Sequence, residues 1–195
     1  TSKDMTPGAY GLTGMGFDAI EPAWAAIETD GSPASHLEVL YLRQPGGGAL
    51  SLDVDGVPLA IDTAFEREAA GIEYVALPDG PHRVELRADG HAATRVYGVV
   101  LEREAPGVIV DQLGVNGMTP AIALLSDEPI VHELLEARRP DVLAVWLGAN
   151  EASELWPRRA WMWRMSARPL RRWVATLCRK VCGVTCFLTR AAFAQ

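Results

Sequence analysis

The sequence lacks three things, and each absence narrows what the chain can be. No apolar run approaches the roughly 18 residues of a membrane-spanning helix, so the chain is not expected to span a membrane. Residues 1–150 hold only 9 basic side chains against 23 acidic ones, and this net charge of −14 argues against a nucleic-acid partner. The chain starts at Thr1 with no apolar signal-like stretch. We therefore expect a processed protein or a fragment of a longer one.

The last part of the chain, residues 151–195, has a different composition. It holds 9 basic and 2 acidic residues, four of the six tryptophans and all three cysteines. Three interpretations are open: a basic amphipathic helix on a membrane, a metal site built from Cys178, Cys182 and Cys186, or a gene read in the wrong frame. No His lies near the cysteines to complete a metal site, and we favour the reading-frame interpretation. Cysteine usage therefore says little about redox compartment.

Residues 22–104 show the pattern of antiparallel strands. Apolar and polar residues alternate on both sides of Asp55-Gly56, which predicts a β-hairpin. The same alternation around Asp79-Gly80 predicts a second hairpin. Even spacing and short turns favour a β-sandwich or jelly roll.

The pattern changes after Ala105-Pro106-Gly107. Two apolar runs, 108–113 and 141–147, read as buried strands of a parallel sheet, and residues 120–138 between them read as a helix interrupted at Pro129. Together they predict one βαβ unit, whose ligand-binding loops follow the strand ends.

Two loop motifs and a short run before the second strand carry a family resemblance. Gly114-Val-Asn-Gly117 follows the first predicted strand, Gly148-Ala-Asn-Glu151 follows the second, and Arg139-Pro-Asp141 precedes the second. In this order the motifs resemble those of the SGNH (GDSL-type) esterases and acylhydrolases, over roughly residues 106–152. The order of domains is similar to that of carbohydrate and peptidoglycan O-acetylesterases with an inserted β-sandwich.

The resemblance implies a fold, an activity and two site residues. The fold is mixed α and β, an antiparallel β-sandwich followed by part of a three-layer α/β domain. The activity is hydrolysis of an acyl ester, such as an O-acetyl group on a polysaccharide or small molecule, without cofactor or metal. The backbone N–H of Gly117 and the side-chain amide of Asn150 form the oxyanion hole, while Asn116 and Glu151 are structural. The resemblance favours a periplasmic or extracellular location.

The family's catalytic motifs are missing. No serine stands in a Gly-Asp-Ser context, and no Asp-x-x-His block follows the second loop. Asp79-Gly-Pro-His82 matches by spacing alone, and we interpret it as a β-turn with a surface histidine. Among the other histidines, His36 and His91 are expected to be solvated and His132 to be a surface or partly buried structural residue. Without a Ser–His pair the chain alone is predicted to be an inactive, aggregation-prone fragment.

These inferences divide the chain into four parts: a hydrolase segment (1–21), the sandwich (22–104), a partial hydrolase core (105–152) and the basic tail (153–195). The alternative function is a non-catalytic glycan-binding sandwich. Its candidate aromatic residues are Trp24, Tyr41, Tyr74 and Tyr97, and the pattern predicts that three of them are buried. We therefore expect weak sugar binding or none. The sequence does not decide the oligomeric state.

Overall fold

The computed structural model describes residues 7–147, 150, 171–172, 175 and 185–190. The chain divides into two compact units, which are described separately. Unit 1 comprises residues 1–14 and 113–195, and unit 2 comprises residues 15–112. Among the described residues, no helix is both long and apolar enough to cross a membrane.

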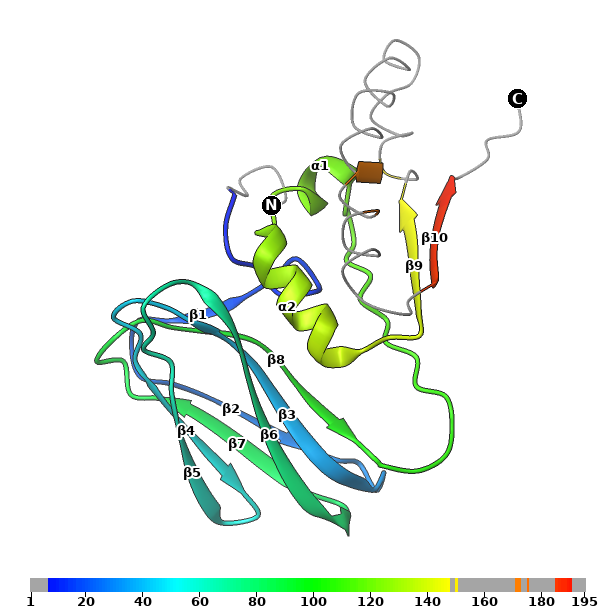
Figure 1. The fold of residues 1–195 in the computed structure, drawn as a ribbon. Helices are drawn as coiled ribbons and strands as arrows, with labels where there is room; N and C mark the ends of the chain where they lie inside the picture. Colours follow the sequence, from blue (N-terminus) through cyan, green and yellow to red (C-terminus); the bar gives the residue numbers. More distant parts are fainter. Residues whose placement is uncertain (1–6, 148–149, 151–170, 173–174, 176–184, 191–195) are drawn as a thin grey trace. The chain divides into compact units, whose positions relative to one another are not determined.

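Unit 2 is a sandwich of two antiparallel four-stranded sheets (Figure 1). The first sheet has the order β1-β8-β3-β6, with β1 at Phe17–Ala19, β8 at Thr94–Glu102, β3 at Ala34–Arg43 and β6 at Ala69–Gly80. The second has the order β2-β7-β4-β5, with β2 at Ala23–Glu28, β7 at Arg83–Ala88, β4 at Ala49–Val54 and β5 at Val57–Asp62. The predicted β-sandwich is confirmed.

Alternating side chains of both sheets form the core between them. The core residues are all buried and are mostly aliphatic: Leu37, Val39, Tyr41, Leu50, Leu52, Val54, Ile61, Val84 and Ala88. The Tyr41 ring covers Gly71 on the neighbouring strand, and a Cβ built on Gly71 would lie only 2.5 Å from Tyr41 Cζ. This close approach accounts for a glycine inside a strand.

One predicted hairpin is confirmed and the other is wrong. Asp55 (φ 53°) and Gly56 (φ 84°) form the turn between β4 and β5, and two positive φ angles are typical of the tight type I′ hairpin turn. By contrast, β6 and β7 belong to different sheets. Asp79-Gly80 therefore ends β6, and the short connection that follows it crosses from one sheet to the other. Local alternation is the same for both kinds of connection, which is why the sequence did not separate them.

The described part of unit 1 contains two helices and a parallel pair of strands. Helix α1 spans Pro120–Ala123, α2 spans Glu128–Arg138, and β9 (Val142–Leu147) pairs in parallel with β10 (Thr185–Arg190). The predicted helix is interrupted before Pro129 rather than at it, because Asp127 caps α2 through a 3.1 Å bond from the Ile130 N–H and Pro129 fits the first turn. The buried face of α2 is Ile130, Val131, Leu134 and Leu135.

The predicted strand at 108–113 is wrong. These residues belong to no strand, and Val108, Ile109 and Val110 are 89%, 61% and 76% exposed. The segment crosses the boundary between the two units at Gln112 and Leu113. A strand requires a neighbour for its backbone hydrogen bonds, and an apolar run in a sequence does not reveal whether such a neighbour exists.

Candidate oxyanion site

The loop that carries Gly117 is a defined turn. The Met118 N–H donates to the Val115 carbonyl over 3.1 Å, and Gly117 has φ +80° at the third position of that turn. This geometry is that of a type II turn, which requires a positive φ that glycine adopts without strain. Beyond the turn, Thr119 Oγ1 accepts a 3.2 Å bond from the Ile122 N–H and anchors the loop to α1.

Asn150 lies directly against this loop. Its side-chain Nδ2 donates to the Met118 carbonyl oxygen over 2.9 Å, and the side chain is partly buried. The two residues predicted for the site, Gly117 and Asn150, are therefore brought together although they are far apart in sequence. Gly148 and Glu151 of the same motif lie outside the described residues.

The N-terminal segment of unit 1 supports the same loop. Gly8 forms a parallel bridge with Ser126, in which its N–H donates to the Leu125 carbonyl over 3.0 Å. A few residues later, the backbone at Gly14 approaches the Met118 side chain so closely that a Cβ there would lie 2.9 Å from Met118 Cε. Gly14 thus lies beside Met118 of the Gly117 turn, while Gly8 pairs with the segment between α1 and α2.

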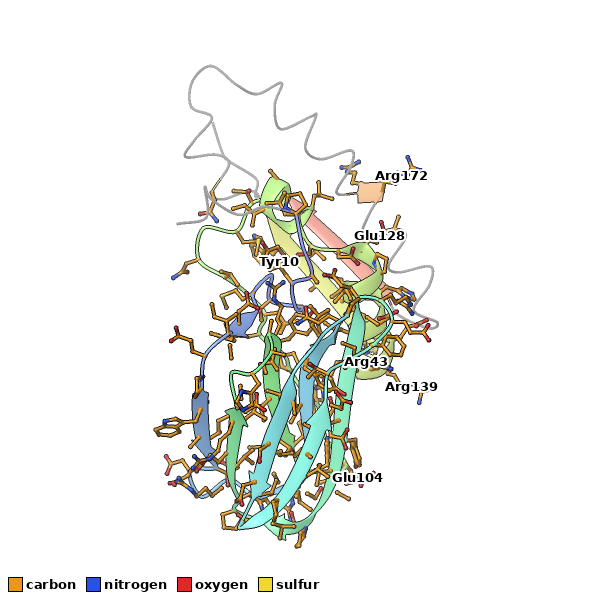
Figure 2. The ribbon with its side chains drawn as sticks, turned by 90° about the vertical axis from the view of Figure 1, so that its left-hand side faces the viewer. Tyr10, Arg43, Glu104, Glu128, Arg139 and Arg172 are labelled. Atoms are coloured by element: carbon orange, nitrogen blue, oxygen red, sulfur yellow. The ribbon has the colours of Figure 1, made fainter. Side chains whose placement is uncertain are left out.

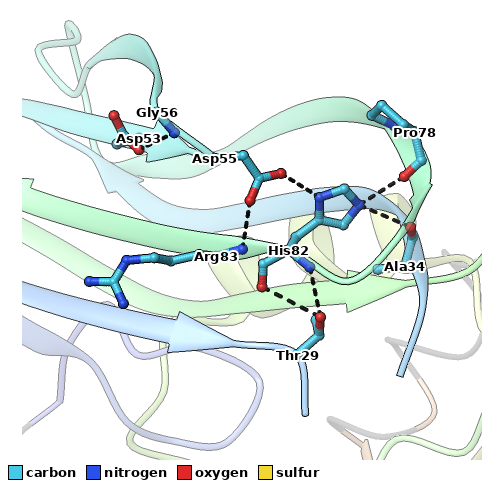
Figure 3. A network of polar contacts seen from close by, with 8 residues as sticks. All are labelled: Thr29, Ala34, Asp53, Asp55, Gly56, Pro78, His82 and Arg83. Atoms are coloured by element: carbon cyan, nitrogen blue, oxygen red, sulfur yellow. Dashed lines mark hydrogen bonds and ion pairs between the residues drawn. The ribbon is translucent and has the colours of Figure 1, made fainter. Parts of the chain in front are cut away.

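The interpretation of His82 as a surface residue is wrong. His82 is only 7% exposed, and both of its ring nitrogens face hydrogen-bond acceptors (Figure 3). Nδ1 lies 2.6 Å from Asp55 Oδ2, and Nε2 lies 2.8 Å from the Pro78 carbonyl and 3.2 Å from that of Ala34. A ring with acceptors at both nitrogens is best satisfied as the doubly protonated cation.

The pair has shifted pKa values in the direction that this cation requires. The hydrogen bond to Asp55 raises the pKa of His82, against the opposing effect of burial. The pKa of Asp55 is lowered, first by the Arg83 backbone N–H and then by His82. The pair joins the β4–β5 turn to the start of β7, and the His82 ring also reaches the Ala34 and Pro78 carbonyls of the other sheet.

The remaining histidines are mostly as expected. His91 is exposed, and His132 is partly buried with a 14% exposed side chain. His36, predicted to be solvated, is instead 12% exposed, because it stacks on Tyr74 with ring centroids 5.4 Å apart. Cysteines 178 and 182 of the proposed metal site lie outside the described residues.

The aromatic residues of the sandwich differ from the prediction that three of four are buried. Tyr41 and Tyr97 are 7% and 6% exposed, whereas Trp24 and Tyr74 are 69% and 54% exposed. The exposure of Trp24 has a signal in the sequence, namely the alanines at 23, 25 and 26. A strand that packs one face on a core usually carries larger apolar residues at alternate positions, and alanines do not fit that pattern.

Comparison with known proteins supports the fold. No protein-family model matches the chain, and no curated protein sequence matches it. A solved structure of a peptidoglycan O-acetylesterase matches with a TM-score of 0.56 and 17% identity, over 95% of this chain and 49% of that one. At this identity the likeness concerns the fold, and this chain spans about half the length of that esterase.

Weaker likenesses concern carbohydrate-active proteins. A two-domain esterase active on acetylated mannans matches over 45% of this chain and 27% of its own length, with 13% identity and a TM-score of 0.34. A carbohydrate-binding module in complex with β-1,4-galactotriose matches over 46% of this chain and 69% of its own, with 14% identity and a TM-score of 0.32. The structural neighbours are thus carbohydrate esterases and carbohydrate-binding modules.

Proposed function

We propose that this chain is part of an SGNH-type esterase that removes acyl groups, above all O-acetyl groups, from a carbohydrate. The observation that carries the proposal is the 2.9 Å bond from Asn150 Nδ2 to the Met118 carbonyl oxygen, next to Gly117. This bond joins the two motifs on which the resemblance rests, and the resemblance implies that these motifs form the oxyanion hole. The fold likeness to a peptidoglycan O-acetylesterase over 95% of this chain is consistent with the proposal.

In this mechanism a serine attacks the ester carbonyl and a histidine accepts the serine proton. The negative charge on the tetrahedral oxygen is stabilised by the Gly117 backbone N–H and by the Asn150 amide, together with the N–H of the nucleophile. A side-chain amide has two N–H donors, and the bond to Met118 uses one of them to fix the direction of the other. Such a substrate would place the protein in the periplasm or outside the cell.

The serine and histidine are proposed to come from polypeptide outside this sequence, since the family's motifs do not locate them here. The 195-residue chain alone is then expected to hydrolyse no acetyl ester. A protein that joins this sequence to a Gly-Asp-Ser block and an Asp-x-x-His block is expected to be active on p-nitrophenyl acetate and on acetylated glycans.

The test is the effect of Asn150→Ala on kcat in that longer protein. Loss of one oxyanion donor is expected to lower kcat by about 10²–10³-fold. Asn116→Ala is the matched control, because Asn116 is exposed in the turn that contains Gly117 and is expected to leave kcat within a few-fold. Equal turnover by the Asn150→Ala variant and the unmodified protein would refute the assignment.

A further inference from the structure

An exposed tryptophan lies among polar side chains on the outer surface of the sheet β2-β7-β4-β5. Trp24 is directly opposite Arg87, and Arg87 is opposite Ser51 on the next strand. Directly opposed residues share a face of a sheet. Since Leu50, Leu52 and Val84 of the same strands point into the core, these three residues point away from it.

The next row of the same face runs parallel to the first. It contains Ala26 of β2, Glu85 of β7 and Asp53 of β4. We call these six residues (Trp24, Ala26, Ser51, Asp53, Glu85 and Arg87) the Trp24 face. The spacing of strands and of alternate residues makes it roughly 10 Å across the strands and about 7 Å along them.

Most charges of the Trp24 face are paired within the sheet, and the Asp53 carboxylate accepts a 2.8 Å bond from the Gly56 backbone N–H. Arg87 forms an ion pair with Glu85, and Arg83, just beyond the face, pairs with Glu28 and Glu85. A guanidinium has five N–H donors, so Arg87 can bind Glu85 and still donate to a ligand. The face therefore offers donors and acceptors without a strong net field, which suits a neutral, polyhydroxylated ligand better than an anion.

The indole of Trp24 is exposed on the Trp24 face. The Trp24 side chain is 69% exposed, while its neighbours Ala26 and Ser51 are small. An indole offers a flat apolar surface with a polar edge. A sugar ring has the matching arrangement, with C–H groups on its faces and hydroxyl groups around its rim.

We propose that the Trp24 face binds a neutral glycan chain, with a sugar ring stacked on Trp24 and its hydroxyl groups bonded to Arg87, Asp53 and Ser51. This inference takes its class of ligand, a carbohydrate, from the proposed function. It adds the surface on which the glycan is held. The sequence pattern predicts weak sugar binding or none, because it predicts that three of the four candidate aromatic residues are buried. Trp24 is exposed, and the proposal therefore replaces that expectation.

The test is calorimetric titration of the full 195-residue chain with N-acetylchitotetraose, a neutral β-1,4-linked oligosaccharide. Trp24→Ala is expected to weaken binding by about tenfold or more, and Arg87→Gln by a smaller factor. Tyr74→Ala is the matched control, since Tyr74 is also exposed (54%) but lies on β6 of the opposite sheet, and it is expected to change the Kd less than about twofold.

Three outcomes would overturn the proposal: no binding by the unmodified chain, unchanged binding by Trp24→Ala, or equal loss in Tyr74→Ala. Sedimentation velocity adds a fourth, in which the unmodified chain self-associates through this face and Trp24→Ala is monomeric. Circular dichroism checks that each variant is folded. Because no ester is cleaved in these titrations, binding that depends on Trp24 supports the glycan face even if the esterase proposal fails.

Discussion

The two units of the chain differ in how completely they bury the apolar side chains of their strands. In the sandwich, two sheets enclose a core in which Leu37, Val39 and Leu52 are fully buried. In unit 1, the strand β9 leaves Val142 and Trp146 56% and 74% exposed in the described structure. A fold made of hairpins and sheet crossings can complete its own core within residues 15–112, whereas a parallel sheet needs strands from distant sequence.

The largest expected effect is a difference in the free energy of unfolding between a buried position of the sandwich and an exposed position of β9. Leu52→Ala removes a side chain with no exposure from the sandwich core and is expected to lower the free energy of unfolding by about 2–5 kcal/mol. Val142→Ala in β9 is expected to change it by less than about 0.5 kcal/mol, because Val142 is 56% exposed. Urea denaturation of the full chain, followed by circular dichroism, measures both. Similar values for the two variants would remove the contrast between the units.

A smaller effect is expected where the sandwich is tightly packed around a glycine. In Gly71→Ala the new methyl group would meet the buried Tyr41 ring, at a cost of about 1–3 kcal/mol. Gly98→Ala, on β8 of the same sheet, is the control, because no atom lies within 4 Å of the position that its new methyl group would take. It is expected to be neutral or slightly stabilising. Thermal denaturation of both variants decides whether contact with Tyr41, rather than loss of glycine itself, sets the cost.

The smallest effect is a pH dependence that arises in the sandwich from His82 and Asp55. The folded-state pKa of His82 is raised above the unfolded value of about 6.5, so its stabilisation is complete below that pH and is lost as pH rises through the folded-state pKa. The pKa of Asp55 is lowered, so its stabilisation is present above about pH 4 and is lost as pH falls through its folded-state pKa.

NMR titration of the His82 ring protons measures this directly. A midpoint above 6.5 is expected for the unmodified chain, and Asp55→Asn should lower that midpoint, because the carboxylate is the largest cause of the shift. In His82→Gln, the part of the stability that is lost as pH rises above about 6.5 should disappear. A His82 midpoint below 6.5 would contradict the network seen in Figure 3.

The sequence predicted those parts of the fold that depend on local pattern. Asp55-Gly56 identified a hairpin because two positive φ angles are needed there, and the apolar stripe of Ile130 and Leu134 identified α2. The partner of a segment is not a local property. For that reason the local pattern predicts a strand at 108–113, although these residues belong to no strand. It also predicts a hairpin turn at Asp79-Gly80, although β6 and β7 lie in different sheets.

The role of Gly117 and Asn150 stays a prediction, whereas the surfaces of the sandwich differ in part from the sequence pattern. Motif order predicts Gly117 and Asn150, and the bond from Asn150 to Met118 brings their loops together. Figure 2 shows the ribbon with the side chains of the described residues. Burial of His82 and exposure of Trp24 were missed, because each depends on which strand lies beside it. Both positions read as ordinary strand or turn residues in the sequence.

The most direct test of the central claim is the structure of the longer protein trapped with a phosphonate that mimics the tetrahedral intermediate. The account predicts that one phosphonyl oxygen lies about 2.7–3.1 Å from both the Gly117 backbone nitrogen and Asn150 Nδ2. The Asn150 amide should keep its bond to the Met118 carbonyl, which is 2.9 Å long here. An oxygen held by other donors, with Gly117 and Asn150 out of hydrogen-bond range, would contradict the account.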